Sequence, residues 1–223
     1  MTKSALLVVD MQEDFCPPHG ALAVAGGRDI ASPISRLLAM PFALTVATRD
    51  WHPIDHVSFD ICNQPPNNKA FECSTMISNP QNAADSMAIP IWPVHCVQGT
   101  PGAEIIPEIN ISEVNRVIDK GQDKGREMFS PFADTFGNKS NAASFDLAAY
   151  LNENGISRVF VVGIAGEHCV RCTAIDAKKE GFEVYVVEEG VKCIDYGEDG
   201  WEATRRQFEK AGIRLVSIEG LEV

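Results

Sequence analysis

The chain has 223 residues, of which 45% are hydrophobic and 22% charged, and its formal net charge is −12 at pH 7. This length is enough to bury one sizeable core, and the acidic excess argues against a nucleic-acid backbone or an anionic membrane as the partner. We therefore expect a single domain over residues 1–223 that acts on a small molecule.

Short apolar, β-branched runs alternate along the chain with amphipathic segments. Six runs are predicted to be strands: Ala5–Val9, Phe42–Thr48, Val114–Ile118, Arg158–Gly163, Glu183–Val187 and Ile213–Ile218. Four segments have a helical period, and glycine follows each of the last three: Asp29–Ala39, Ala142–Asn154, Val170–Glu180 and Gly200–Ala211. The order predicts a three-layer α/β/α fold around a mostly parallel six-stranded sheet.

The segment from residue 60 to residue 90 departs from this alternation. It contains four prolines and five asparagines and shows no sustained hydrophobic period. A long segment without a pattern in a compact domain is usually a functional loop. We therefore predict a loop insertion at about 60–90 that forms a lid or a wall of the active site.

Four predicted strands are followed by residues that can perform chemistry. Asp10 follows the first strand, Asp50 and His52 the second, Lys120 the third and Cys169 the fourth. Because the carboxyl ends of parallel strands meet at one edge of a sheet, we expect these side chains to form one site. Each has a plainer explanation alone: an aspartate can cap a turn, a lysine can face solvent, and a cysteine can be a small core residue.

The sequence before Cys169 favours a nucleophile at this position. An apolar run from Val161 leads through small residues to Cys169, which opens a predicted helix. Unpaired N–H groups at a helix start lower the pKa of a thiol and favour the thiolate. The same groups can stabilise the oxyanion that forms when a thiolate attacks a carbonyl. The segment therefore indicates acyl-transfer chemistry.

A second group of residues has the composition of a metal site. Asp50 and His52 are two positions apart, so they point the same way from an extended segment, and His95 follows the predicted insertion. An Asp/His/His set suits a borderline divalent cation and leaves coordination positions for water or substrate. His56 is a further candidate ligand. The alternative is that His52 and His56 only cap a turn.

The cysteine content and the hydropathy bear on the compartment. Seven cysteines at irregular spacings indicate reduced thiols rather than a disulfide framework. No apolar run approaches the ~20 residues that a membrane span requires. We expect a cytoplasmic protein with no membrane partner; the nucleus and the peroxisome stay open as further locations, although no targeting signal is seen. A homo-oligomer is compatible with the sequence.

Five motifs occur in a fixed order along the chain: Val8–Phe15; Thr48–Pro53 with His56 and Ser58–Phe59; Trp92–Glu104; Lys120–Gly121; and Gly163–Ala165 with Cys169–Val170. With these motifs the chain resembles the nicotinamidases, pyrazinamidase-like members of the isochorismatase-like cysteine hydrolase superfamily. The resemblance covers nearly the whole chain. The Asp/His pair and the Trp-Pro-x-His segment favour this branch over relatives that hydrolyse vinyl ethers or carbamoyl compounds and lack the metal set.

The resemblance implies an amidohydrolase that converts nicotinamide and water to nicotinic acid and ammonia through a thioester, in NAD salvage. Cys169 is then the nucleophile, Asp10 exchanges protons with it, and Lys120 orients Asp10. The N–H groups of Ala165 and Cys169 form the oxyanion hole. The family commonly has a cis peptide before this alanine, which here is the Ile164–Ala165 bond.

The resemblance also implies one divalent metal ion, zinc first, with manganese or iron as alternatives. Its ligands are Asp50, His52 and His95, and His56 is a further candidate because some members use an additional histidine or carboxylate. In this family the metal binds the pyridine nitrogen of nicotinamide, which positions the ring and withdraws electron density from the carbonyl.

Apolar residues are expected to hold the substrate ring. By resemblance, the flanking residues are Phe15, Trp92 and Ile164. A lone aromatic residue is usually part of the core, so ordinary packing is the first interpretation of three further aromatic residues, although all three could line the pocket: Trp51, Phe129 and Phe132.

Other interpretations of the chain remain. Cys169 and Cys172 form a C-x-x-C at a strand-to-helix junction, which on its own is typical of a thiol redox protein. His168 precedes the nucleophile and suggests a Cys–His pair, although adjacent residues at a helix start seldom face each other. A binding protein that keeps the fold and a related amidase for another small carboxamide are the remaining alternatives.

Overall fold

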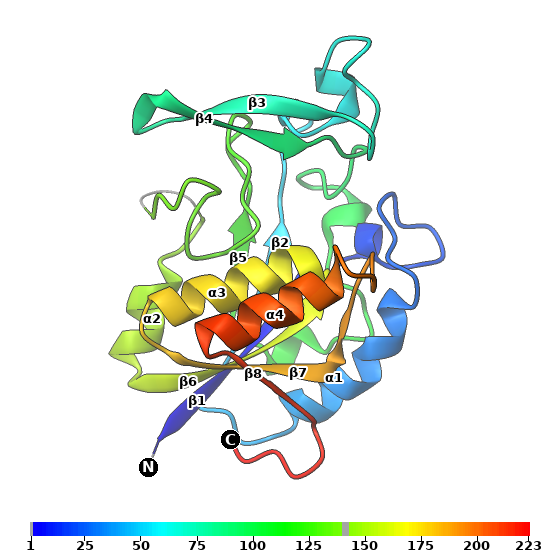
Figure 1. Cartoon of the computed structure of the whole chain (residues 1–223). Coiled ribbons are helices and arrows are strands. Elements are labelled where there is room, and N and C mark those ends of the chain that lie inside the picture. The colour runs from blue at the N-terminus through cyan, green and yellow to red at the C-terminus, as the bar shows by residue number, and fades with distance from the viewer. Residues whose placement is uncertain (1, 140–142) are drawn as a thin grey trace.

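A parallel six-stranded sheet forms the centre of the molecule (Figure 1). In this computed structural model, residues 2–139 and 143–223 are described. The strands, in spatial order, are β5 (Arg116–Lys120), β2 (Leu44–Asp50), β1 (Lys3–Val9), β6 (Ile156–Ile164), β7 (Glu183–Lys192) and β8 (Arg214–Val216). All neighbouring pairs are parallel, which confirms the predicted sheet.

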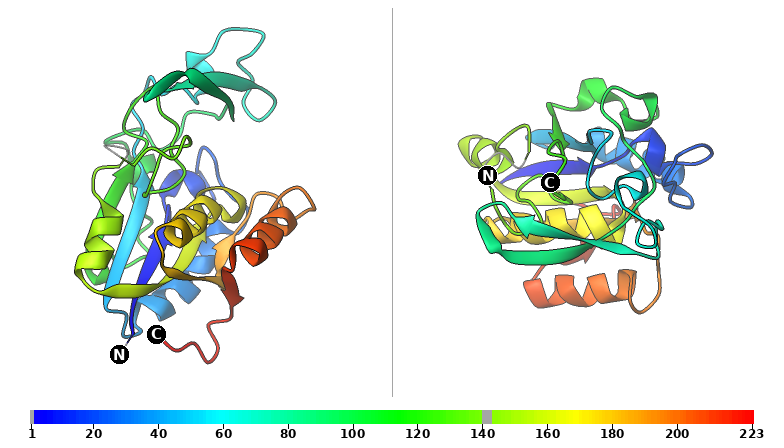
Figure 2. Two further views of the ribbon diagram at one scale, coloured as in Figure 1. Left: turned by 60° about the vertical axis from the view of Figure 1, so that its left-hand side comes forward. Right: turned by 90° about the horizontal axis from the view of Figure 1, so that it is seen from above.

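Helices cover both faces of the sheet (Figure 2). One face packs against α2 (Leu147–Glu153), α3 (Arg171–Lys179) and α4 (Trp201–Ala211), and the other against α1 (Ala31–Leu38) with the chain around residues 96–109. None of the helices in the described ranges has the length and apolar content that crossing a bilayer requires. The layers are those of the predicted α/β/α fold.

The second predicted helix is shorter than its sequence pattern. Of the predicted range Ala142–Asn154, Ala142 lies outside the described residues, and α2 begins only at Leu147. The carboxylate of Asp146 accepts a hydrogen bond from the N–H of Ala149, so the aspartate caps the helix and fixes where it begins.

The prediction of a patternless loop at 60–90 is wrong. This segment contains an antiparallel hairpin, β3 (Ser74–Asn79) with β4 (Asn82–Pro90), which projects beyond the carboxyl end of the sheet (Figure 1). In its strands only Ile77 and Ile89 are buried. Because both faces of the hairpin are largely exposed, no alternation of apolar and polar residues marks it in the sequence.

Gly163 lies in β6, opposite Val9 of β1. Its φ is +126°, and a Cβ atom added there lies 2.0 Å from the carbonyl oxygen of Val9. We expect Gly163→Ala to lower the free energy of unfolding by about 3 kcal/mol, measured by urea denaturation. Gly181→Ala is the control, since Gly181 also has a positive φ but no atom within 4 Å of an added Cβ. Equal losses in the two variants would show that backbone conformation, and not the contact with Val9, sets the cost.

Candidate functional site

The carboxyl end of the sheet gathers the predicted catalytic side chains. Asp10 follows β1, Asp50 ends β2, Lys120 ends β5, and Cys169 follows β6. All four are buried. A carboxylate oxygen of Asp10, one of Asp50 and the Sγ of Cys169 lie within 4.8 Å of one another. The expectation that strand ends would bring these residues together is therefore confirmed.

Lys120 is the fully buried centre of this group. Its Nζ forms ion pairs with Asp10, at 2.9 Å, and with Asp50, and it lies 3.5 Å from the Sγ of Cys169. Burial alone would lower the pKa of Lys120, but the two carboxylates together raise it well above its usual value. Lys120 is therefore a fixed positive charge that touches both carboxylates and the thiol.

Asp10 is held in a single orientation. Its φ is +50°, a conformation that non-glycine residues rarely adopt, and its backbone N–H donates to the carbonyl oxygen of Thr48 at 3.2 Å. The Thr48 hydroxyl donates to Oδ1 of Asp10 at 2.7 Å. Burial raises the pKa of Asp10, while Lys120 opposes this shift. A carboxyl with a raised pKa is suited to accepting and returning a proton.

The prediction that Cys169 opens an ordinary α-helix is wrong. It lies in a single π-helical turn, Gly166–Val170, which precedes α3. The expected lowering of its pKa is also wrong for this site, because burial raises the pKa of the thiol well above its usual value. Lys120 opposes this shift, and the carboxylate of Asp10 adds to it. The thiol therefore needs a proton acceptor, and Asp10 is adjacent.

The structure does not support His168 as a partner of Cys169. Its ring contacts the aromatic residues Trp92 and Phe129, with centroid separations of 5.5 and 6.0 Å. The groups beside the Sγ of Cys169 are Lys120 and Asp10 instead. His168 forms part of the pocket wall.

Three of the predicted metal ligands lie together. Asp50, His52 and His95 are buried, and each offers a ligand atom within 4.8 Å of the others. Nδ1 of His52 bonds to the carbonyl oxygen of Gly121 at 2.8 Å, and Nδ1 of His95 bonds to that of Pro93 at 2.7 Å. These bonds fix both rings and leave Nε2 for a metal, which is the usual arrangement of zinc-binding histidines. The residues therefore fit a divalent cation.

His56 lies beside this cluster but is occupied. Its Nδ1 bonds to the hydroxyl of Ser58 at 2.8 Å, and its Nε2 to the carbonyl oxygen of Arg126 at 2.9 Å. Both ring nitrogens are therefore used within the protein, and His56 is not part of the Asp50, His52 and His95 group. We leave it out of the ligand set.

A small, mainly apolar pocket joins the two groups of residues. Asp50 and His95 line one part of it, and Ala165 and Cys169 line another. Its remaining walls come from the end of β6, from helical turns and from loops: Phe15, Leu22, Val24, Trp92, Phe129, Ile164, His168 and Ile194. All three predicted ring-binding residues are among them. Such a lining, apolar with a few convergent polar groups, suits a flat aromatic ligand.

The lining of the pocket also bears on two further expectations from the sequence. Of the three aromatic residues with two open interpretations, Phe129 lines the pocket, Phe132 packs in the core, and Trp51 lies against the guanidinium of Arg49. Among the described residues that line the pocket, none belongs to the segment 60–90. Phe71 of that segment instead packs edge-on against Trp92, at 5.9 Å between centroids, so it supports the wall from outside.

Comparison with known proteins decides the family. The profile of the isochorismatase domain matches residues 4–220. The chain belongs to the isochorismatase family. Among curated members, a nicotinamidase of Acinetobacter baylyi is 38% identical over 86% of this chain and 82% of its own length. A nicotinamidase of Saccharomyces cerevisiae is 36% identical over 95% of this chain and 98% of its own length.

Solved structures of the isochorismatase family share this fold. The yeast nicotinamidase bound to the inhibitor nicotinaldehyde superposes with a TM-score of 0.88 at 28% identity, covering 96% of this chain and 99% of the other. A protein of L. infantum in complex with nicotinate gives 0.81 at 32% identity, covering 99% of this chain and 96% of the other. The pyrazinamidase of Pyrococcus horikoshii in complex with zinc gives 0.73 at 35% identity, covering 97% and 99%.

Several residues of this isochorismatase-family site were not found from the sequence. Thr48 and Gln12 lie within recognised motifs but carried no predicted role; Gln12 exchanges two hydrogen bonds with the backbone of Asp50, at 2.7 and 2.8 Å. Leu22, Val24 and Ile194 lie in loops with no pattern of their own. The Ile164–Ala165 peptide is cis, as the resemblance implied.

Proposed function

We propose that this chain acts as one catalytic domain, a nicotinamidase that hydrolyses nicotinamide to nicotinic acid and ammonia in NAD salvage. The observation that carries the proposal is that Cys169, with Asp10 and Lys120 behind it, lines one cavity together with Asp50 and His95, two of the three proposed metal ligands. Nicotinamidases that are 36–38% identical to this chain support the choice of substrate.

In the proposed first step, Asp10 accepts the thiol proton of Cys169, and the sulfur attacks the carboxamide carbon. The carbonyl oxygen becomes an oxyanion, which the N–H groups of Ala165 and Cys169 stabilise. Asp10 then passes its proton to the amide nitrogen, the C–N bond breaks, and ammonia leaves. Lys120 keeps its charge throughout, since it balances Asp10 and favours the thiolate.

In the second step, water replaces ammonia beside the thioester. Asp10 removes a proton from the water, whose oxygen attacks the acyl carbon. The C–S bond breaks, nicotinic acid is released, and the proton on Asp10 returns to the sulfur of Cys169. Atoms balance over the cycle, because one water is consumed and one ammonia is formed.

We propose zinc as the metal, held by Asp50, His52 and His95. Two imidazoles and a carboxylate are a common donor set for zinc, and the Pyrococcus horikoshii pyrazinamidase is described in complex with zinc. When bound, the ion supplies positioning of the pyridine nitrogen and withdrawal of electron density from the ring. The walls formed by Phe15, Trp92 and Ile164 would confine the ring in the pocket that Cys169 lines.

The proposal is tested by measuring ammonia release from nicotinamide by the purified protein, with Cys169→Ala as the blank. The same assay follows after chelation and after the return of zinc. We expect release that needs both Cys169 and the metal. A folded, metal-loaded protein that releases no ammonia from nicotinamide is not a nicotinamidase, and a panel of other small carboxamides then tests the related-amidase alternative.

His52→Ala is expected to remove most of the bound metal and to reduce kcat/KM by roughly 100-fold, since it deletes one of three ligands. Metal content is measured by elemental mass spectrometry. His56→Ala is the matched control: both rings are buried, but the nitrogens of His56 are used within the protein. Full metal occupancy in His52→Ala, or its loss in His56→Ala alone, would show that the ligand set is wrong.

A further inference from the structure

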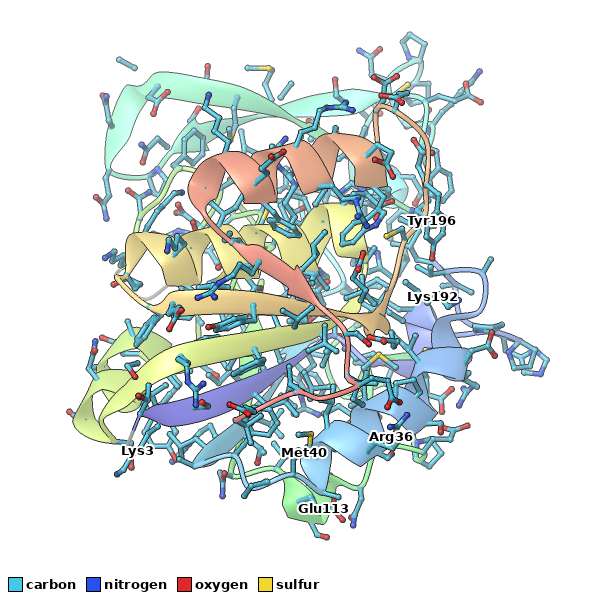
Figure 3. All side chains as sticks on the ribbon, turned by 60° about the horizontal axis from the view of Figure 1, so that its bottom comes forward. Lys3, Arg36, Met40, Glu113, Lys192 and Tyr196 are labelled. Atoms are coloured by element: carbon cyan, nitrogen blue, oxygen red, sulfur yellow. The ribbon has the colours of Figure 1, made fainter. Side chains whose placement is uncertain are left out.

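The segment between β7 and α4, residues 193–200, borders the pocket on its outer side. Tyr196, labelled in Figure 3, marks this segment where it runs from the end of β7 toward α4. Ile194 is 49% exposed, yet it lines the pocket together with Ala165, His168 and Cys169. Its side chain therefore lies at the mouth, between solvent and the nucleophile.

Glu167 connects this segment to the turn that carries the nucleophile. Its Oε1 accepts hydrogen bonds from the N–H groups of Ile194, at 2.8 Å, and Asp195, at 2.7 Å. Glu167 is only 8% exposed, and within the described part of the chain its Oε2 has no hydrogen-bond partner. Two bonds from neighbouring amides to one buried carboxylate oxygen form a strong, charge-assisted anchor.

The turn and the segment are also in close contact beside this anchor. A Cβ atom added at Gly166 lies 2.4 Å from the Sγ of Cys193 and 2.9 Å from the ring of Trp201. Asp195 fixes the shape of the segment, since its Oδ1 accepts from the N–H of Gly197 at 2.7 Å and its carbonyl oxygen accepts from Trp201 at 2.9 Å. These contacts between the turn and the segment, together with the bonds of Asp195, fix the position of Ile194.

Glu167 does not line the pocket, and the proton transfers at Cys169 do not require it. Burial and the neighbouring Glu167 raise the pKa of Cys193 to about 12, so Cys193 stays a neutral thiol and adds no charge to the anchor. The proposed chemistry does not use this buried carboxylate, which holds one wall of the substrate pocket. We therefore expect it to contribute to substrate binding.

We propose that Glu167 is a positioning residue that acts through Ile194 and sets how closely the mouth of the pocket confines the substrate ring. The inference rests on the proposed nicotinamidase function. An apolar wall that contacts the ring equally before and during the reaction contributes to binding of both states, so its loss changes KM and leaves kcat nearly constant.

The test is a double-mutant cycle with nicotinamide. Glu167→Ala leaves two buried amides without an acceptor, and we expect KM to rise about tenfold while kcat stays within about twofold. Ile194→Ala is expected to raise KM to a similar extent. In the Ile194→Ala background, Glu167→Ala is expected to raise KM by less than about twofold, because the wall it positions is already gone.

Glu167→Gln is the conservative variant, since its amide oxygen can still accept both N–H groups without the charge. We expect its KM to fall between those of the wild type and Glu167→Ala, and it keeps the test valid if the alanine variant does not fold. Hydrogen exchange of the peptide spanning 193–200 is read in parallel, and exchange faster than in the wild type is expected in both variants.

Three results would overturn the inference. These are a fall in kcat with unchanged KM, a KM effect that persists in full in the Ile194→Ala background, and unchanged hydrogen exchange in the peptide spanning 193–200. The proposed nicotinamidase function and the proposed positioning role of Glu167 can be refuted separately. A wild-type protein that releases no ammonia from nicotinamide refutes the function, whereas the exchange measurement on the same samples still decides whether Glu167 holds the segment.

Discussion

Cys169→Ala is expected to reduce nicotinamide hydrolysis by about 10⁴-fold or more, because no other group can form the thioester. The Sγ of Cys169 is the nucleophilic atom beside both Lys120 and Asp10, and it lines the pocket. Removing one buried sulfur leaves a small cavity, so we expect the free energy of unfolding to fall by only about 1 kcal/mol. Ammonia release measures the first effect and urea denaturation the second.

Cys172→Ala is the matched control for this variant. Cys172 lies one helical turn further along, in α3, and all seven cysteines are free thiols. We expect Cys172→Ala to keep wild-type turnover, because an amidase does not need the second cysteine of the C-x-x-C pair. Turnover that survives in Cys169→Ala would refute the thioester mechanism, and a matching loss in Cys172→Ala would revive the redox alternative.

The positions of the six sheet strands along the chain could be predicted because most of each strand is an apolar run, but their ends could not. The second strand was predicted as Phe42–Thr48 and is observed as Leu44–Asp50. Its last residues pair with β5, in the register Arg49 with Asp119 and Asp50 with Lys120. These residues are polar, so no hydrophobic pattern extends the strand to them, and only the neighbouring strand determines where it ends.

The candidate site could be predicted as a set of residues, but its electrostatics could not. Strand-end logic and motif order together pointed to Asp10, Lys120 and Cys169. The sign of the thiol pKa shift was wrong because it depends on burial, which a linear pattern does not report. Ile194 was missed for a related reason: its role follows from a contact between two loops that lie about thirty residues apart in the chain.

Asp10→Asn is expected to lower kcat by about 10³-fold or more, because the amide cannot carry a proton from the thiol to the leaving nitrogen. Asparagine has nearly the same shape, and its oxygen can still accept from the Thr48 hydroxyl, which lies 2.7 Å from Oδ1 of Asp10. Thr48→Val is the control that keeps the carboxylate and removes the hydroxyl, while the backbone N–H of Asp10 keeps its bond to the carbonyl oxygen of residue 48; we expect a loss of only about tenfold.

Alkylation of Cys169 by iodoacetamide separates the proton-transfer role of Asp10 from a role in forming the thiolate. The carboxylate of Asp10 raises the pKa of Cys169, whereas Lys120 lowers it. When Asp10→Asn removes the negative charge and Lys120 remains, the thiolate becomes easier to form. We therefore expect alkylation in Asp10→Asn to be at least as fast as in the wild type, although hydrolysis nearly stops. Near-normal hydrolysis in Asp10→Asn would instead mean that the amide nitrogen receives its proton from a different group.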